Sequence, residues 1–127
     1  MTKSKSVSRT HLNNRGIYEL GNHVLVSLYG IAFHLLDDLD AICAAFEEAV
    51  SVCGATVLNR FSHQFNPQGV TIVYALAESH ISIHTFPETG SCAIDVYTCG
   101  SMDSKKGMQV LIDHFNPIEI DMREVKR

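Results

Sequence analysis

Between Ala55 and Thr98 the chain repeats one pattern: a strand-like run of apolar and β-branched residues, followed by a short turn. The runs cover residues 55–65, 70–76, 80–86 and 91–98. Two of the turns are typical proline- and glycine-containing sequences, Asn66-Pro67-Gln68-Gly69 and Pro87-Glu88-Thr89-Gly90. Strands joined by short turns pair as antiparallel neighbours, so this region predicts a largely antiparallel sheet.

Two other segments have the period of an amphipathic helix. In residues 37–53 the apolar side chains recur at steps of three and four: Leu39, Ile42, Phe46, Ala49, Val50 and Cys53. Aspartates precede this pattern as candidate N-caps, and Gly54 follows it as a candidate C-cap. In residues 102–115 the apolar stripe consists of Met108, Leu111, Ile112 and Phe115, and Asn116-Pro117 ends it. Both segments are predicted helices.

Strands at residues 23–29 and 118–123 complete the order β-α-β-β-β-β-α-β. This order predicts an α/β fold, a two-layer α/β sandwich with a mostly antiparallel sheet and two helices on one face. Residues 18–127 are expected to form one domain. Residues 1–17 contain four basic residues and no acidic one, and we expect a flexible N-terminal arm. With both helices on one side, the other face of the sheet would be exposed to solvent. A dimer in which the two sheets pack face to face would bury it.

Composition excludes several classes of protein. A formal net charge of -4 is opposite in sign to the basic surface that nucleic-acid binding needs. No apolar run approaches the roughly 20 residues of a membrane span, and no signal peptide opens the chain, so we expect a cytoplasmic protein. The four cysteines form no C-x-x-C pair, which favours reduced thiols over a zinc ribbon.

Residues 78–88, Glu-Ser-His-Ile-Ser-Ile-His-Thr-Phe-Pro-Glu, carry an unusual density of reactive side chains for a strand. In one regular strand, His80, Ser82 and His84 share one face, and Ser79 lies on the other. Ser79 and His84 then point apart, which does not suit a nucleophile and its base. Their cooperation requires a distorted or broken backbone at Glu78-Ser79.

The same segment allows a metal site to be considered, with His80 and His84 joined by Cys92 or Cys99. The two histidines lie about 13 Å apart along a regular strand, too far for both to reach one ion easily. We therefore expect no metal, and we interpret His80 as a partly buried, hydrogen-bonded strand histidine.

Residues 78–100 closely resemble the self-cleavage and active-site segment of the bacterial and archaeal S-adenosylmethionine decarboxylases. The matching motifs are residues 78–88, then Gly90, then Ala-Ile-Asp-Val-Tyr-Thr-Cys-Gly at 93–100. Upstream, Gly21-Asn22-His23 with Leu28-Tyr29-Gly30 resembles the family's first strand, and His63 to Val70 resembles its central hairpin. The resemblance extends over about residues 18–122.

The resemblance implies that Ser79 attacks the Glu78 carbonyl and becomes a pyruvoyl cofactor, which cuts the chain into residues 1–78 and 79–127. His84 is similar to the acid-base group of this processing. Thr71 stands where the family usually has a serine that assists it, so the hydroxyl is kept and the residue type is not.

For turnover, the resemblance implies a Schiff base between the pyruvoyl group and S-adenosylmethionine, with Cys99 as the proton donor. Phe65, Ile81, Phe86 and Glu88 match substrate-binding positions, with the aromatic rings near adenine and the carboxylate on the ribose. The family's active sites lie at a dimer interface, and its product serves spermidine synthesis.

Two alternatives remain at this point. One is a pyruvoyl enzyme of this fold that decarboxylates a basic amino acid, ornithine or arginine, although Glu88 and both aromatic positions favour a nucleoside substrate. A non-catalytic paralogue is the other alternative: Thr71 favours it, and the complete set of Ser79, His84 and Cys99 is against it.

Overall fold

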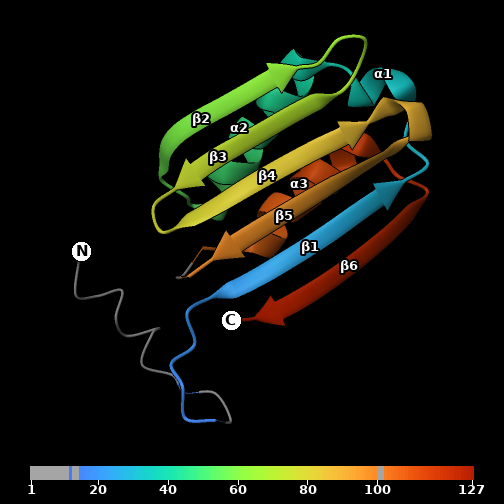
Figure 1. Ribbon diagram of the computed structural model, residues 1–127. Coiled ribbons are helices and arrows are strands. Elements are labelled where there is room, and N and C mark those ends of the chain that lie inside the picture. The colour runs from blue at the N-terminus through green and yellow to red at the C-terminus, as the bar shows by residue number, and fades with distance from the viewer. Residues whose placement is uncertain (1–11, 13–14, 100–101) are drawn as a thin grey trace.

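The sheet has six strands, and every neighbouring pair is antiparallel. A computed structural model describes residues 12, 15–99 and 102–127. The strands are β1 (Asn22–Tyr29), β2 (Val57–Gln64), β3 (Val70–Leu76), β4 (Ser79–Phe86), β5 (Ser91–Thr98) and β6 (Glu119–Lys126). Their order is β2-β3-β4-β5-β1-β6, which places the first strand of the chain between β5 and the last strand (Figure 1).

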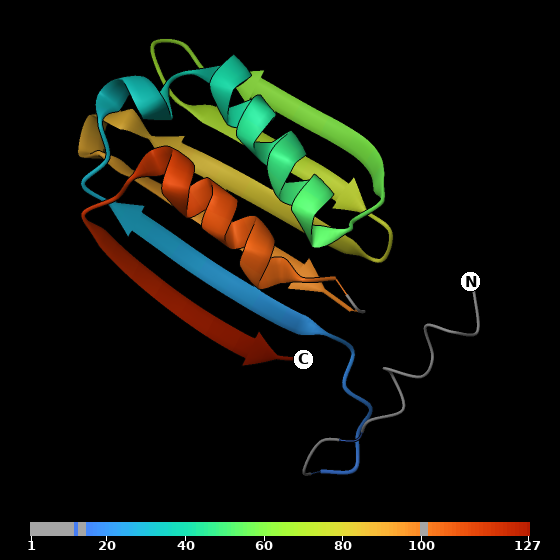
Figure 2. The ribbon, with the colours of Figure 1, turned by 180° about the vertical axis from the view of Figure 1, so that it is seen from behind.

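Two long helices cover one face of this sheet, as Figure 2 shows. Helix α2 (Leu39–Cys53) begins after Asp38, whose carboxylate accepts a hydrogen bond from the Ala41 amide at 3.1 Å. It ends at Gly54, which has a φ of 74°. Helix α3 (Ser104–Phe115) begins after Asp103, whose carboxylate accepts from the Lys106 amide. For α2 these are the caps that the sequence predicted, an aspartate before the helix and a glycine after it, whereas the cap at Asp103 was not predicted.

The predicted fold class and element order are confirmed, with two additions. A short helix α1 (Phe33–Leu36) and a 3-10 turn η3 (Pro87–Thr89) were not predicted. Both long helices begin two residues later than predicted, and β6 continues to Lys126 because it pairs with β1 along the full length of that strand.

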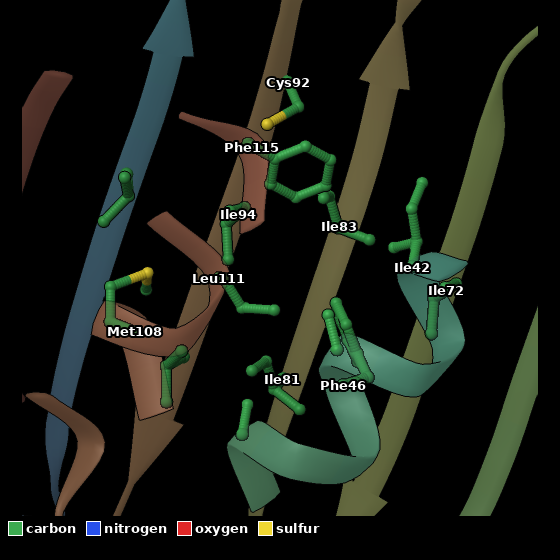
Figure 3. Close-up of a cluster of buried hydrophobic side chains, with 14 of the residues drawn as sticks. Ile42, Phe46, Ile72, Ile81, Ile83, Cys92, Ile94, Met108, Leu111 and Phe115 are labelled. Carbon is green, nitrogen blue, oxygen red and sulfur yellow. The ribbon is translucent and has the colours of Figure 1, made fainter. Parts of the chain in front are cut away.

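The hydrophobic core lies between the helices and the sheet (Figure 3). Phe46 of α2 and Phe115 of α3 have no exposed surface, and Ile72, Ile83 and Ile94 face them from three neighbouring strands. Alternate strand residues therefore point into the core, and the residues between them point to the opposite face of the sheet.

No helix among the described residues covers that opposite face, which we call the open face. It carries the exposed apolar side chains of Leu25, Phe61 and Val73 between polar neighbours. The predicted N-terminal arm lies largely outside the described residues, apart from a bridge between Leu12 and Tyr18. Within the part of the chain that the structure describes, no helix is long and apolar enough to cross a membrane.

Candidate active site

The turn between β3 and β4 holds the predicted cleavage position. Leu76 pairs with Ser79, so Ala77 and Glu78 form a two-residue hairpin loop. Glu78 has a φ of 60°, and Asn116 is the other non-glycine residue with a positive φ among those described. A left-handed conformation is uncommon for a residue with a long side chain. A left-handed residue therefore directly precedes Ser79, whereas β4 itself runs as one regular strand from Ser79 to Phe86.

Cys99 lies against this turn from the end of β5. Its thiol donates a hydrogen bond to the main-chain carbonyl oxygen of Glu78 at 2.6 Å, and its sulfur lies 3.5 Å from the Glu78 carboxylate. The Glu78 carbonyl is the group that a Ser79 nucleophile would attack. One end of the sheet thus holds Glu78, Ser79 and Cys99 together.

His84 and Thr71 lie at the opposite end of β3 and β4. They are paired residues of the two strands, and the Thr71 hydroxyl is 3.0 Å from the His84 Nδ1 atom. Ser79 and His84 are five residues apart in one continuous strand, which separates their Cα atoms by about 16 Å. Within one protomer the structure does not bring Ser79 and His84 together.

The predicted aromatic residues and Glu88 lie at the same end as His84. Phe65 follows β2 and is 48% exposed, and Phe86 ends β4 and is 43% exposed. Glu88 is exposed on the η3 turn directly after Phe86. The Ile81 side chain is different, because it is 3% exposed and faces the helices. Any contact of Ile81 with a ligand on the open face must involve its main chain.

A cluster on the open face was not predicted from the sequence. The Asp95 Oδ2 atom lies 2.6 Å from His23 Nε2 and 2.9 Å from His80 Nε2, and the Ser82 hydroxyl donates to Asp95 Oδ1. We call these four residues the Asp95 cluster. Partial burial opposes ionisation of Asp95, but hydrogen bonds from Ser82, His80 and His23 lower the pKa of its carboxyl.

The metal alternative from the sequence is not supported by the placement of its residues. Cys92 is buried on the helix side of the sheet, where burial raises the pKa of its thiol to about 12, whereas His80 and His84 face the other side. His23, His80 and Asp95 do offer ligand atoms within 4.8 Å of one another. Their hydrogen bonds to one another already satisfy these atoms. His80 is the hydrogen-bonded strand histidine that the sequence predicted, and all four cysteines are free.

Comparison with known sequences gives a consistent match. Residues 22–127 match the sequence profile of the family described as S-adenosylmethionine decarboxylase. The S-adenosylmethionine decarboxylase proenzymes of Sulfurihydrogenibium sp. and Methanococcus maripaludis are 45% and 44% identical to this chain over 109 and 110 residues. The alignments cover 85% and 86% of this chain, and 82% and 90% of the two relatives.

Comparison with solved structures agrees. The crystal structure of the adenosylmethionine decarboxylase from Aquifex aeolicus matches with a TM-score of 0.79 and 39% identity, over 86% of this chain and 91% of that chain. An AdoMetDC monomer from Trypanosoma brucei shares the fold, with a TM-score of 0.58 and 17% identity over 80% of this chain and 44% of that chain. The profile covers every strand and helix of the sheet domain, and the chain belongs to the S-adenosylmethionine decarboxylase family.

Proposed function

We propose that this chain decarboxylates S-adenosylmethionine with a pyruvoyl group that it makes from its own Ser79. The observation that carries this proposal is the hydrogen bond from the Cys99 thiol to the Glu78 carbonyl, at a residue with a positive φ. Strain and a polarising donor act on the same peptide bond that self-cleavage would break.

The cleavage chemistry follows from the groups at this turn. The Ser79 Oγ attacks the Glu78 carbonyl carbon and displaces the Ser79 nitrogen, which leaves an ester and an amine. The thiol of Cys99 stabilises the negative charge that develops on the carbonyl oxygen during this attack. A base then removes the Ser79 α-proton, the bond between Ser79 Cβ and Oγ breaks, and the Glu78 carboxylate leaves with that oxygen, so that residue 79 becomes a dehydroalanine. The dehydroalanine tautomerises to an imine, one water molecule hydrolyses this imine and releases ammonia, and residues 79–127 then begin with a pyruvoyl group.

The residues present fit such a group. Ser79 is half-buried at the start of β4, and Cys99 contacts the adjoining carbonyl, so a proton donor lies beside the new chain end. A pyruvoyl group supplies an electron sink for the electrons released with carbon dioxide. Cys99 would then hold the proton that is delivered to the former α-carbon of the substrate.

The base must come from elsewhere, because His84 lies at the far end of its own strand. We propose a dimer in which two open faces pack together about a two-fold axis that runs across the strands. This operation places the Ser79 end of β4 over the His84 end of the partner's β4. Each site then combines Ser79 and Cys99 of one protomer with a second copy's His84 and Thr71. The Thr71 hydroxyl orients the His84 ring through its Nδ1 atom.

The same arrangement supplies a binding surface for the substrate. Two exposed aromatic side chains, Phe65 and Phe86, would stack on an adenine ring and attract a sulfonium cation. Glu88, two residues after Phe86, would accept hydrogen bonds from ribose hydroxyls. These groups suit a charged nucleoside better than a small basic amino acid. The decarboxylated product would provide the aminopropyl group for spermidine synthesis.

Denaturing mass spectrometry of the purified protein tests the processing. We expect chains of residues 1–78 and 79–127, the second beginning with a blocked pyruvoyl group, and we expect Ser79→Ala to remain whole. A wild-type chain that keeps its full mass of 14.1 kDa after long incubation contradicts the proposal.

Release of labelled carbon dioxide tests the substrate. We expect it from carboxyl-labelled S-adenosylmethionine and not from ornithine or arginine. Release from a basic amino acid alone would assign the same chemistry to the other substrate. A chain that is cleaved but releases carbon dioxide from none of the three would be the non-catalytic paralogue.

A further inference from the structure

The Asp95 cluster is directly adjacent to the proposed cleavage position, yet none of its residues has a role in the chemistry above. His80 is the residue after Ser79, and it pairs with Tyr97, two residues before Cys99. His23 of β1 also pairs with Tyr97 from the other side. The cluster therefore spans three adjacent strands at the end of the sheet that carries Ser79 and Cys99.

Cleavage at Glu78-Ser79 would change what holds this end of β4. In the intact chain a two-residue hairpin loop ties Ser79 to Leu76. After cleavage Ser79 becomes a chain end, and chain ends fray unless other contacts hold them. His80 would then be one residue from the free end, and its side chain is held by Asp95.

The cluster also joins the two proposed products. His23 belongs to residues 1–78, and His80 and Asp95 belong to residues 79–127. The contact of His23 with Asp95, at 2.6 Å, is thus a contact between the two chains beside the new end. Tyr97 adds a stacked contact with the His80 ring, with centroids 6.1 Å apart, and an edge contact with His23 at 5.7 Å. Arg127 lies over the Tyr97 ring at 5.4 Å.

We propose that Asp95 is a positioning residue, which acts through His80 and His23 to hold the pyruvoyl-bearing end of β4 opposite Cys99 after cleavage. The proposal rests on the proposed function. A displacement of about 1 Å at a reacting group can lower a rate by about 100-fold, so a contact one residue from that group has a large effect on turnover. Its effect on self-cleavage is small, because the hairpin still holds Ser79 at that stage.

Asp95→Asn is the most specific test, because it keeps the size and shape of the side chain and replaces one of the two carboxylate oxygens with an NH2 group. The amide nitrogen of the new Asn side chain is itself a donor. It would therefore face one of the groups that now donate to Asp95, and that hydrogen bond would be lost. Asp121→Asn is the matched control: Asp121 is also a carboxylate on a strand of the open face, pairs with Ser27, and contacts Arg123 outside the cluster.

We expect Asp95→Asn to lower kcat by 10- to 100-fold, with KM for S-adenosylmethionine within threefold of wild type and the rate of self-cleavage within threefold. Asp121→Asn should leave all three unchanged. His80→Ala should reproduce the loss in kcat, and His80→Gln should restore most of it, because a glutamine amide can still donate to Asp95. If Asp95→Asn does not fold, the comparison of kcat between His80→Ala and His80→Gln tests the proposal by itself.

Several outcomes would overturn the proposal. One is an unchanged kcat in fully cleaved Asp95→Asn enzyme. Another is a loss of kcat that sedimentation at the assay concentration explains by dissociation of a dimer, or a His80→Gln variant as impaired as His80→Ala. Failure of the proposed function is distinguishable from all of these, because it would appear in the wild-type protein as an uncut chain or an absence of decarboxylation.

Discussion

Glu78 occupies a backbone conformation that glycine adopts without strain, at a φ of 60°. Strain of this kind costs about 1 kcal/mol or more and tends to persist where a site uses it. We predict that Glu78→Gly relieves the strain and slows self-cleavage about fivefold relative to Glu78→Ala. Time courses of the uncut chain by denaturing mass spectrometry measure the difference.

Glu78→Ala is the matched reference, because both variants remove the carboxylate near Cys99 and only the glycine removes the Cβ atom. Equal rates for the two variants would show that the backbone conformation does not contribute to cleavage. A faster Glu78→Gly variant would show that the side chain, through its Cβ atom, hinders the attack.

Single residues differ in how far the sequence predicts them. The alternation of strand side chains was enough to predict that Ser79 and His84 cannot cooperate in a regular strand, because parity needs no tertiary information. The Asp95 cluster could not be predicted in this way. His23 and Asp95 are far apart in the chain, and only the antiparallel register of β1 on β5 brings them into contact. The sequence contained one sign of the cluster: Asp95 is a charged residue between the apolar residues Ile94 and Val96 of a predicted strand.

Helices α2 and α3 pack closely at Gly107. A Cβ atom added there would lie 2.2 Å from the Cys53 sulfur and 3.1 Å from the Ala49 carbonyl oxygen. Alanine has the higher helix propensity, by about 1 kcal/mol, but overpacking at a helix contact costs about 1–3 kcal/mol. We predict that Gly107→Ala lowers the free energy of unfolding, measured by urea denaturation in an uncleavable Ser79→Ala background.

A second variant identifies the cause. Adding Cys53→Ala to Gly107→Ala removes the closest atom, so the double variant should recover part of the lost stability relative to Cys53→Ala alone. A Gly107→Ala protein more stable than its parent would show that the two helices can move apart at little cost.

The elements predicted best are those with a period and a clear stop. Strands β3 and β5 have the predicted boundaries because alternating apolar residues end at glycine- or proline-containing turns or at a polar loop. Helix α1 has four residues, too few to show a helical period. Strand β6 extends beyond its apolar half because pairing with β1 orders it, and its charged residues suit an exposed sheet edge.

At the scale of the molecule, the predicted site residues other than the buried Ile81 form two groups at opposite ends of the sheet. The sequence, through its resemblance to the family, supplied the residues of both groups. It did not show which residues one protomer holds together, because that depends on which strands lie side by side and in which direction they run. The contact of Cys99 with Glu78 and that of Thr71 with His84 define the two groups.

A site shared between two protomers makes a specific prediction for mixed dimers. Ser79→Ala and His84→Ala are each expected to be inactive alone. In a co-expressed mixed dimer, one site contains the intact Ser79 of the His84→Ala protomer and the intact His84 of the Ser79→Ala protomer. We therefore predict that co-expression restores decarboxylation, and that mass spectrometry finds cleavage fragments of the His84→Ala chain only.

The control is a pair of variants from the same end of the sheet. Ser79 and Cys99 lie together in one protomer, so no mixed dimer of Ser79→Ala and Cys99→Ala contains a complete site. This pair should remain inactive under the conditions that rescue the first pair. If neither pair regains activity although mixed dimers form, each site must lie within one protomer, and β4 would have to bend by many ångströms to bring His84 to Ser79. If both pairs regain activity, Cys99 must also act across the dimer on the partner's Ser79, because Ser79 and Cys99 both belong to residues 79–127 and exchange of the cleaved chains cannot combine them.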